Sequence, residues 1–166
     1  MIKIGIIGAM EPEVEELKKE MDLTAVIRKA GMDFHDGTLN GTPVVIVRCG
    51  IGKVNAALCV QILADEFKVS HVINTGVAGA LNPRLDIGDI LISRDAIHHD
   101  MDVRIFGYRL GEVPQMGFLE FKADEKLMAL AKEACEKANP DTNVMYGRVV
   151  SGDQFVSDKA KKAWLA

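Results

Sequence analysis

The segment Ile4-Gly-Ile-Ile-Gly-Ala-Met-Glu-Pro-Glu-Val14 determines how the start of the chain is predicted to fold. Its apolar, β-branched first half is typical of a central strand that is covered on both faces. The acidic stretch that follows carries Val14, Leu17 and Met21 at helical spacing. We therefore predict a buried strand, a short loop and a helix.

The same strand–loop–helix pattern recurs along the chain. A strand that ends near Arg48 leads through Cys49-Gly-Ile-Gly-Lys53 into a helix that ends near Lys68, and the strand His71–Thr75 leads into the loop Gly76-Val-Ala-Gly-Ala80. An antiparallel pair is predicted at 33–41 and 43–47 around Asn40-Gly41, and further strands at 89–93 and 144–151. Between them lie an irregular segment at 95–121 and a helix that ends before Pro140, and a last helix begins near Lys159. This alternation predicts an α/β fold, a three-layer α/β/α sandwich around a mixed central β-sheet.

Length and composition restrict the class of protein. A chain of 166 residues with 48% hydrophobic content is long enough for one well-buried domain, residues 1–166, and not comfortably for two. Its net charge of −4, without a run of Lys or Arg, argues against nucleic acid or an anionic membrane as partner, and no apolar stretch approaches the roughly 18 to 20 residues of a membrane span. Cys49, Cys59 and Cys135 have neither disulfide nor zinc spacing, so we expect a reducing cytoplasm. The expected partners are a small molecule and another subunit.

The glycine-containing loop at 50–53 is a weak motif when it is considered alone. A Walker loop would need a glycine and a Ser or Thr where this chain has Val47 and Val54, and Asn55 stands where a dinucleotide fingerprint has its third glycine. A tight turn between a strand and a helix is an equally good interpretation.

Other single residues also leave two interpretations open. Glu13 follows the carboxyl end of the first strand, where it could be a catalytic carboxylate or a surface charge that is favoured in a first helical turn. The cluster His98-His99-Asp100 favours loop hydrogen bonding over metal ligation, since no second ligand cluster accompanies it. Phe106 and Tyr108 are typical of loop-anchoring aromatics, and Phe155 could lie in the core or stack on a planar base.

Six segments together carry a specific resemblance that none carries alone. In order and in spacing they resemble the 5′-methylthioadenosine/S-adenosylhomocysteine nucleosidases, and the similarity covers essentially the whole chain. The segments are Ile4–Val14, Gly50–Val54, Asn74–Gly79, His99-Asp100 with Asp102-Val103, Phe106-Gly-Tyr108, and Val150–Asp153 with Phe155. The resemblance implies a purine nucleoside phosphorylase-like fold and hydrolysis of the N-glycosidic bond, which releases adenine and a 5-thioribose product in methionine salvage and in removal of the methyl-cycle by-product.

The resemblance also implies a role for each matching residue, without a cofactor or a metal. Glu13 would position and activate the attacking water and stabilise an oxocarbenium-like ribose. Ala9, Met10 and Ile51 would line the ribose and alkylthio group, and Val77, Ala78 and Gly79 would lie beneath the nucleoside. Phe155 would stack on adenine, and Val156 would read the base edge through its backbone. In a homodimer, Phe106 and Pro114 would close the alkylthio pocket of the neighbouring subunit.

Two departures from the family pattern define the alternatives. Val77 stands where many members have serine, and the family's later Met-Glu and Ser-Asp segments, which hold the ribose and protonate adenine N7, have no counterpart before Ala166. We therefore expect that the sequence lacks its C-terminal portion, and that a protein ending at Ala166 would be poorly soluble and inactive. The alternatives are a purine nucleoside phosphorylase, whose phosphate-gripping arginine and serine would be replaced by Asn74 and Val77, and a non-catalytic nucleoside-binding protein.

Overall fold

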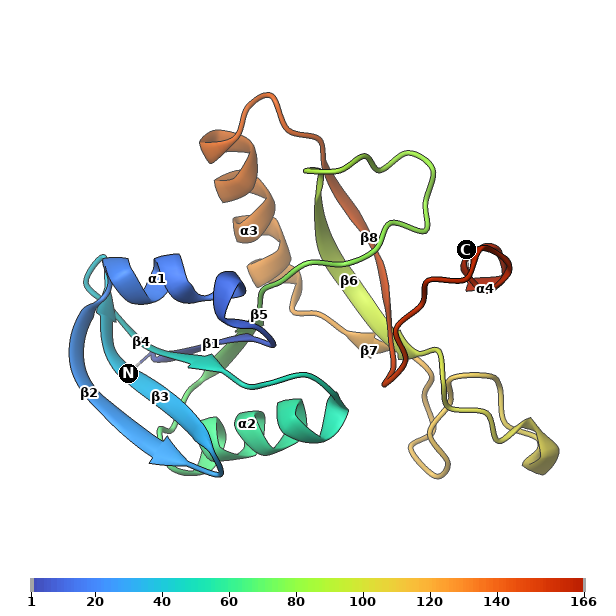
Figure 1. Cartoon of the computed structure of the whole chain (residues 1–166), viewed down its shortest axis with the longest axis horizontal. Helices are drawn as coiled ribbons and strands as arrows, with labels where there is room; N and C mark the ends of the chain where they lie inside the picture. The colour runs from blue at the N-terminus through green and yellow to red at the C-terminus, as the bar shows by residue number, and fades with distance from the viewer. Residues whose placement is uncertain (1, 166) are drawn as a thin grey trace. The chain divides into compact units, whose positions relative to one another are not determined.

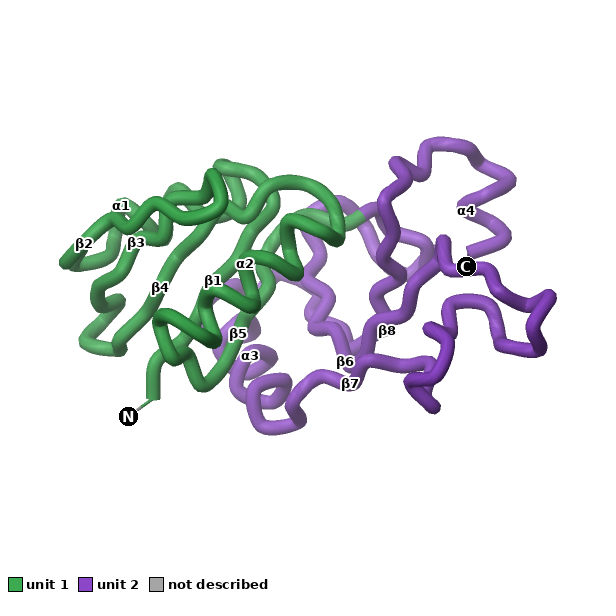
Figure 2. The backbone as a smooth tube through the Cα atoms, turned by 90° about the horizontal axis from the view of Figure 1, so that it is seen from below, with its two compact units in different colours: residues 1–78 green, residues 79–166 purple. Residues whose placement is uncertain are grey.

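The computed structural model describes residues 2–165 and divides into two compact units, unit 1 (Met1–Ala78) and unit 2 (Gly79–Ala166), which are coloured separately in Figure 2. The elements of unit 1 are β1 (Ile4–Gly8), the single-turn 3-10 helix η1 (Glu11–Glu13), α1 (Glu15–Glu20), β2 (Asp22–Lys29), β3 (Met32–Leu39), β4 (Thr42–Arg48), α2 (Lys53–Asp65) and β5 (His71–Asn74).

Unit 1 is built around a five-stranded mixed sheet with the strand order β2-β3-β4-β1-β5. The central β1 is parallel to β4 and to β5, whereas β2, β3 and β4 pair antiparallel. Successive side chains point to opposite faces of a strand. Accordingly Ile6 packs with Val14 next to α1, whereas Ile7 packs with Leu63 of α2. Helix, sheet and helix form three layers (Figure 1), which confirms the predicted fold class for this unit.

The antiparallel part of the sheet contains the predicted hairpin and an additional strand. Asn40 and Gly41 both have positive φ, 50° and 77°, as a two-residue hairpin turn requires. The turn joins β3 to β4, as predicted. Strand β2 was not predicted; it lies at the sheet edge and pairs only with β3.

Unit 2 contains a three-stranded sheet with the order β7-β6-β8. Its elements are β6 (Ile90–His98), η2 (Arg104–Phe106), β7 (Phe121–Lys122), α3 (Glu125–Ala138), β8 (Val144–Ser151) and α4 (Lys159–Leu165). The segment 95–121 was predicted to be irregular, but β6 continues to His98 because its last four residues pair in parallel with Arg148–Ser151. Among residues 2–165, no helix has the length and apolarity needed to cross a membrane.

An ion pair joins the two long strands of unit 2. The Arg148 guanidinium donates to both carboxylate oxygens of Asp95, with an Nη2–Oδ2 distance of 3.0 Å. Asp95 is buried, and this hydrogen bonding lowers the pKa of its carboxyl group below the ordinary value. A carboxyl group whose pKa is lowered by folding stabilises the folded state above its unfolded pKa of about 3.9 and loses that contribution as the pH falls. The pair therefore stabilises the pairing of β6 with β8 near neutral pH.

We expect Asp95→Asn to lower the free energy of unfolding by about 1 to 3 kcal/mol at pH 7, because the amide cannot accept both charged hydrogen bonds. The difference between variant and parent should shrink as the pH falls below about 4, because the carboxyl group of the unfolded parent is protonated there while the folded one, with its lowered pKa, is protonated only at a lower pH. Urea unfolding at pH 7 and at pH 3 measures both values. An equal loss of stability at the two pH values would show that the charge of Asp95 is not what matters.

Candidate active site

Three parallel strands of unit 1 end at one edge of the sheet. Gly8 of β1 lies opposite Arg48 of β4, and Ile7 lies opposite Asn74 of β5. Backbone hydrogen bonds continue this register into the loops: Cys49 N donates to Gly8 O at 2.9 Å, and Thr75 N donates to Ile7 O at 2.9 Å. Ligands of open α/β sheets bind beyond the carboxyl ends of the strands. The loops after β1, β4 and β5 are therefore the candidate site in this unit.

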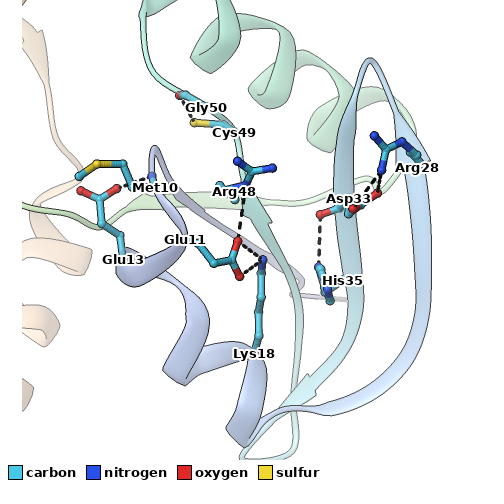
Figure 3. A network of polar contacts seen from close by, with 10 residues as sticks. All are labelled: Met10, Glu11, Glu13, Lys18, Arg28, Asp33, His35, Arg48, Cys49 and Gly50. Atoms are coloured by element: carbon cyan, nitrogen blue, oxygen red, sulfur yellow. Dashed lines mark hydrogen bonds and ion pairs between the residues drawn. The ribbon is translucent and has the colours of Figure 1, made fainter.

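The half-buried carboxylate of Glu13 links two of these loops. Its Oε2 accepts a hydrogen bond from Met10 N at 2.9 Å, and its Oε1 accepts one from Val77 N at 3.0 Å. Figure 3 shows Glu13 beside Met10 at the end of η1. A carboxylate has about four lone-pair sites, so the two backbone donors fix its orientation and leave capacity for a water molecule or a hydroxyl group.

Two glycines make room for this carboxylate. A Cβ atom on Gly76 would lie 2.5 Å from Oε1 of Glu13. A Cβ atom on Gly8 would lie 3.0 Å from the Cβ of Glu13 and 2.8 Å from a methyl group of Val14. Neither Gly8 nor Gly76 has a positive φ, so close approach and not backbone conformation requires glycine there. The sequence analysis did not assign them this role; the available signal was a glycine at the end of one strand, Gly8, and another two residues after the end of a second, Gly76.

The other predicted residues of unit 1 lie in the same three loops. Ala9 and Met10 follow β1, Ile51 follows β4, and Val77 and Ala78 follow β5. Ile51 and Val77 are exposed although they are apolar, which suits contact with the apolar parts of a ligand. Hydrogen bonds from Met10 N and Val77 N to the Glu13 carboxylate connect the loops after β1 and β5.

A cysteine adjacent to the site is not suited to nucleophilic chemistry. Burial raises the pKa of the Cys49 thiol, and the negative charge of Glu13 raises it further. Burial also raises the pKa of the nearby Cys59 thiol, to about 12. The thiolate is the nucleophilic form of cysteine, so both groups are unreactive near neutral pH. Glu13 is thus the candidate catalytic group of unit 1.

The predicted residues of unit 2 lie on its loops. Phe155 follows β8 and is 95% exposed, so it does not pack into the core of the described part of unit 2. Phe106 ends η2 and is 76% exposed, so it does not anchor its loop. Pro114 and Val156 are half-buried, and Gly79 begins the unit with no atom within 4 Å of its would-be Cβ.

The His99-Asp100 pair holds the segment that leads to Phe155. His99 N donates to Ser151 O at 2.9 Å, and Asp100 Oδ2 accepts from Asp153 N at 2.8 Å. A Cβ on Gly152 would lie 2.6 Å from the His99 ring. The predicted loop hydrogen-bonding role is confirmed for Asp100. Within residues 2–165, no group of three or more His, Cys, Asp or Glu side chains is arranged to hold a metal ion.

Comparisons with known proteins agree on one group. The family model of the phosphorylase superfamily matches residues 3–166. A curated 5′-methylthioadenosine/S-adenosylhomocysteine nucleosidase from Staphylococcus haemolyticus is 46% identical over 153 residues, which cover 92% of this chain and 66% of the relative. One from Bacillus cereus is 43% identical over 162 residues, covering 98% of this chain and 69% of the relative.

Solved structures give the same result. The nucleosidase of Colwellia psychrerythraea in complex with adenine superposes with a TM-score of 0.93 at 41% identity, covering 98% of this chain and 66% of that one. The nucleosidase of Neisseria meningitidis in complex with methylthio-immucillin-A has a TM-score of 0.93 at 38% identity, and the match covers 98% of this chain and 70% of that one. The chain therefore spans about two thirds of the length of the proteins it matches.

Proposed function

Because the chain belongs to the 5′-methylthioadenosine/S-adenosylhomocysteine nucleosidase family of the phosphorylase superfamily, we propose that its protein hydrolyses the N-glycosidic bond of these two nucleosides. The observation that carries the proposal is the Glu13 carboxylate, held by the N–H groups of Met10 and Val77 at the carboxyl ends of parallel strands. The released products are adenine and a 5-thioribose.

The proposed chemistry uses the fixed orientation of this carboxylate. A carboxylate oxygen of Glu13 takes a proton from water while the water oxygen bonds to the anomeric carbon of ribose. The carbon–nitrogen bond breaks, and its electron pair goes to adenine, which takes up a proton from solvent. Glu13 returns its proton to solvent, so the net change is the addition of one water molecule. The transition state resembles an oxocarbenium ion, so the negative charge of Glu13 stabilises it as well.

Hydrolysis is favoured over phosphorolysis by the charge and polarity of the site. Glu13 would repel a phosphate anion, and Val77 supplies no hydroxyl group to hold one.

The test measures adenine release by the natural gene product with and without inorganic phosphate. We expect equal rates and a free 5-thioribose. A rate that requires phosphate, with a pentose 1-phosphate as product, would identify a phosphorylase instead.

For unit 2 we propose that Phe155 stacks on adenine and that the backbone of Val156 reads its edge. Support comes from the exposure of the Phe155 ring and from the hydrogen bonds of His99 and Asp100 to the preceding segment. Gly79, Ala78 and Val77 are proposed to lie beneath the nucleoside, and Ala9, Met10 and Ile51 to contact its ribose and alkylthio group.

We expect Phe155→Ala to weaken nucleoside binding by roughly 1 to 3 kcal/mol, since base–aromatic stacking contributes about that much elsewhere. Phe155→Tyr is the matched control, because it keeps an aromatic face and should bind nearly normally. Calorimetric titration with adenine measures the affinity, and circular dichroism verifies the fold. Unchanged affinity of a folded Phe155→Ala protein would remove this residue from the base site.

A homodimer is proposed in which Phe106 and Pro114 close the alkylthio pocket of the neighbouring subunit. Phe106 and the adjacent Ile105 are both exposed on η2, as apolar side chains that contact another chain would be. We also propose a role in methionine salvage and a location in a reducing cytoplasm; the three free cysteines suit the proposed location.

Mixing a Phe106→Ala chain with a Glu13→Gln chain is expected to restore activity. In the mixed dimer, the site that keeps Glu13 also receives an intact Phe106 from its neighbour. Adenine release should exceed that of either variant alone after the chains have exchanged, as checked by native mass spectrometry. Mixed dimers that form without any gain in activity would contradict a shared site.

A further inference from the structure

The single turn η1 carries a second carboxylate that the proposed chemistry does not use. Glu11 is the first residue of η1 and Glu13 is the last. In Figure 3 their carboxylates point away from each other, Glu13 toward Met10 and Glu11 toward Lys18 and Arg48. The two carboxylates therefore have different partners although they share one helical turn.

Two basic side chains from different elements bind the Glu11 carboxylate. Lys18 Nζ from α1 lies 2.8 Å from Oε1 and 3.1 Å from Oε2. Arg48 Nε, at the end of β4, lies 3.5 Å from Oε2. The Lys18 side chain is only 13% exposed, so its ammonium group is held in place more firmly than most surface lysines. These contacts tie η1 to α1 and to the strand end that lies opposite Gly8.

A turn of this kind does not hold itself in place. Two backbone hydrogen bonds close it, Glu13 N to Met10 O at 3.1 Å and Val14 N to Glu11 O at 3.0 Å, and Met10 N donates to the Glu13 carboxylate at 2.9 Å. Hydrogen bonds of 3-10 helices have poorer geometry than those of α-helices. Val14, which is 1% exposed, anchors the C-terminal end of the turn in the core. The ion pairs of Glu11 anchor the N-terminal end.

We propose that Glu11, held by Lys18 and Arg48, is a positioning residue that sets the orientation of Glu13 and thereby the rate of the chemical step. The proposal rests on the proposed catalytic role of Glu13. Glu11 itself does not contact the reacting atoms. Since a displacement of about 1 Å at a catalytic group can cost about 10² in rate, a small rotation of η1 is sufficient to lower kcat.

A structural role alone predicts a different result. Exposed and half-exposed ion pairs contribute little to the free energy of unfolding, and α1 offers a matched example in Glu16 and Lys19, whose oxygen and nitrogen lie 2.5 Å apart. That pair lies on the same helix but does not bind η1. If the Glu11–Lys18 pair mattered only for stability, breaking it would lower the unfolding temperature and leave kcat unchanged, and breaking the more exposed Glu16–Lys19 pair would change neither.

The experiment measures steady-state adenine release and thermal unfolding for variants of the natural gene product. We expect Glu11→Gln and Lys18→Met to lower kcat about tenfold, with KM within about twofold and an unchanged unfolding temperature. Lys18→Arg keeps the ion pair and should retain near-normal kcat, and Glu16→Gln should equal the parent. A normal kcat for Glu11→Gln, or an equal loss for Glu16→Gln, would overturn the proposal.

A double-mutant cycle with Glu13→Gln separates this inference from the proposed function. If Glu11 acts through Glu13, adding Glu11→Gln to Glu13→Gln causes little further loss, whereas a further tenfold loss would overturn the positioning role. Near-normal turnover of Glu13→Gln alone would reject the proposed function and this inference with it. A large loss for Glu13→Gln beside a normal Glu11→Gln would reject this inference only.

Discussion

Glu13→Gln is expected to lower kcat for adenine release by a factor on the order of 10² to 10⁴, with a much smaller change in KM. The substitution keeps the shape of the side chain, and the amide oxygen can still accept from Met10 N or from Val77 N. It removes the group that takes a proton from water and the negative charge that faces the developing cation. The chemical step should therefore suffer more than ground-state binding.

The measurement is a steady-state assay of adenine release together with calorimetric binding of a non-hydrolysable nucleoside analogue. Glu16→Gln is the matched control, since it makes the same chemical change on the neighbouring α1. Turnover by Glu13→Gln close to that of Glu16→Gln would remove the catalytic assignment of Glu13.

The sequence predicts the elements whose pattern is local. The buried runs of β1 and β4 are apolar because both faces of the sheet are covered there, and such runs are recognisable without a structure. Strand β5 forms where a buried strand was predicted, but none of its residues is buried and Ile73 and Asn74 are exposed. Edge strand β2 is not recognisable, because most of its side chains are exposed and its pattern has no buried face. The end of β6 is missed for another reason: Asp95 and His98 are polar, and this segment becomes a strand through pairing with Arg148–Ser151 of β8 and with Phe121–Lys122 of β7.

The site depends on contacts that no local pattern contains. Glu13 alone could be a surface charge in a first helical turn. Its hydrogen bond with Val77 N joins residues that are 64 positions apart, and this contact supports the proposed catalytic role without deciding it. The resemblance to a family placed Glu13 and Val77 near one nucleoside, but the glycine that makes their contact possible, Gly76, emerges only from three-dimensional distances.

Gly76→Ala is expected to lower kcat by a factor on the order of 10², with little loss of stability. The added methyl carbon would lie 2.5 Å from Oε1 of Glu13, 2.8 Å from its Cδ and 3.2 Å from Oε2. Gly76 does not have a positive φ, so alanine can adopt its backbone conformation. The carboxylate is the far end of a flexible side chain, and so it moves before the fold does. Its movement breaks the hydrogen bond from Val77 N and misdirects the water-activating oxygen.

Gly5→Ala is the matched control for the prediction at Gly76, because it adds a methyl group 2.9 Å from Leu63 in the core, away from the carboxylate. Kinetics and thermal unfolding of both variants separate the two effects. Gly76→Ala should lose turnover and keep its unfolding temperature, whereas Gly5→Ala should lose stability and keep the turnover of its folded fraction. Combining Gly76→Ala with Glu13→Gln should add little to the loss from Glu13→Gln, because both changes disable the same carboxylate. If Gly76→Ala retained parental turnover, the orientation imposed on Glu13 by Val77 would not contribute to catalysis.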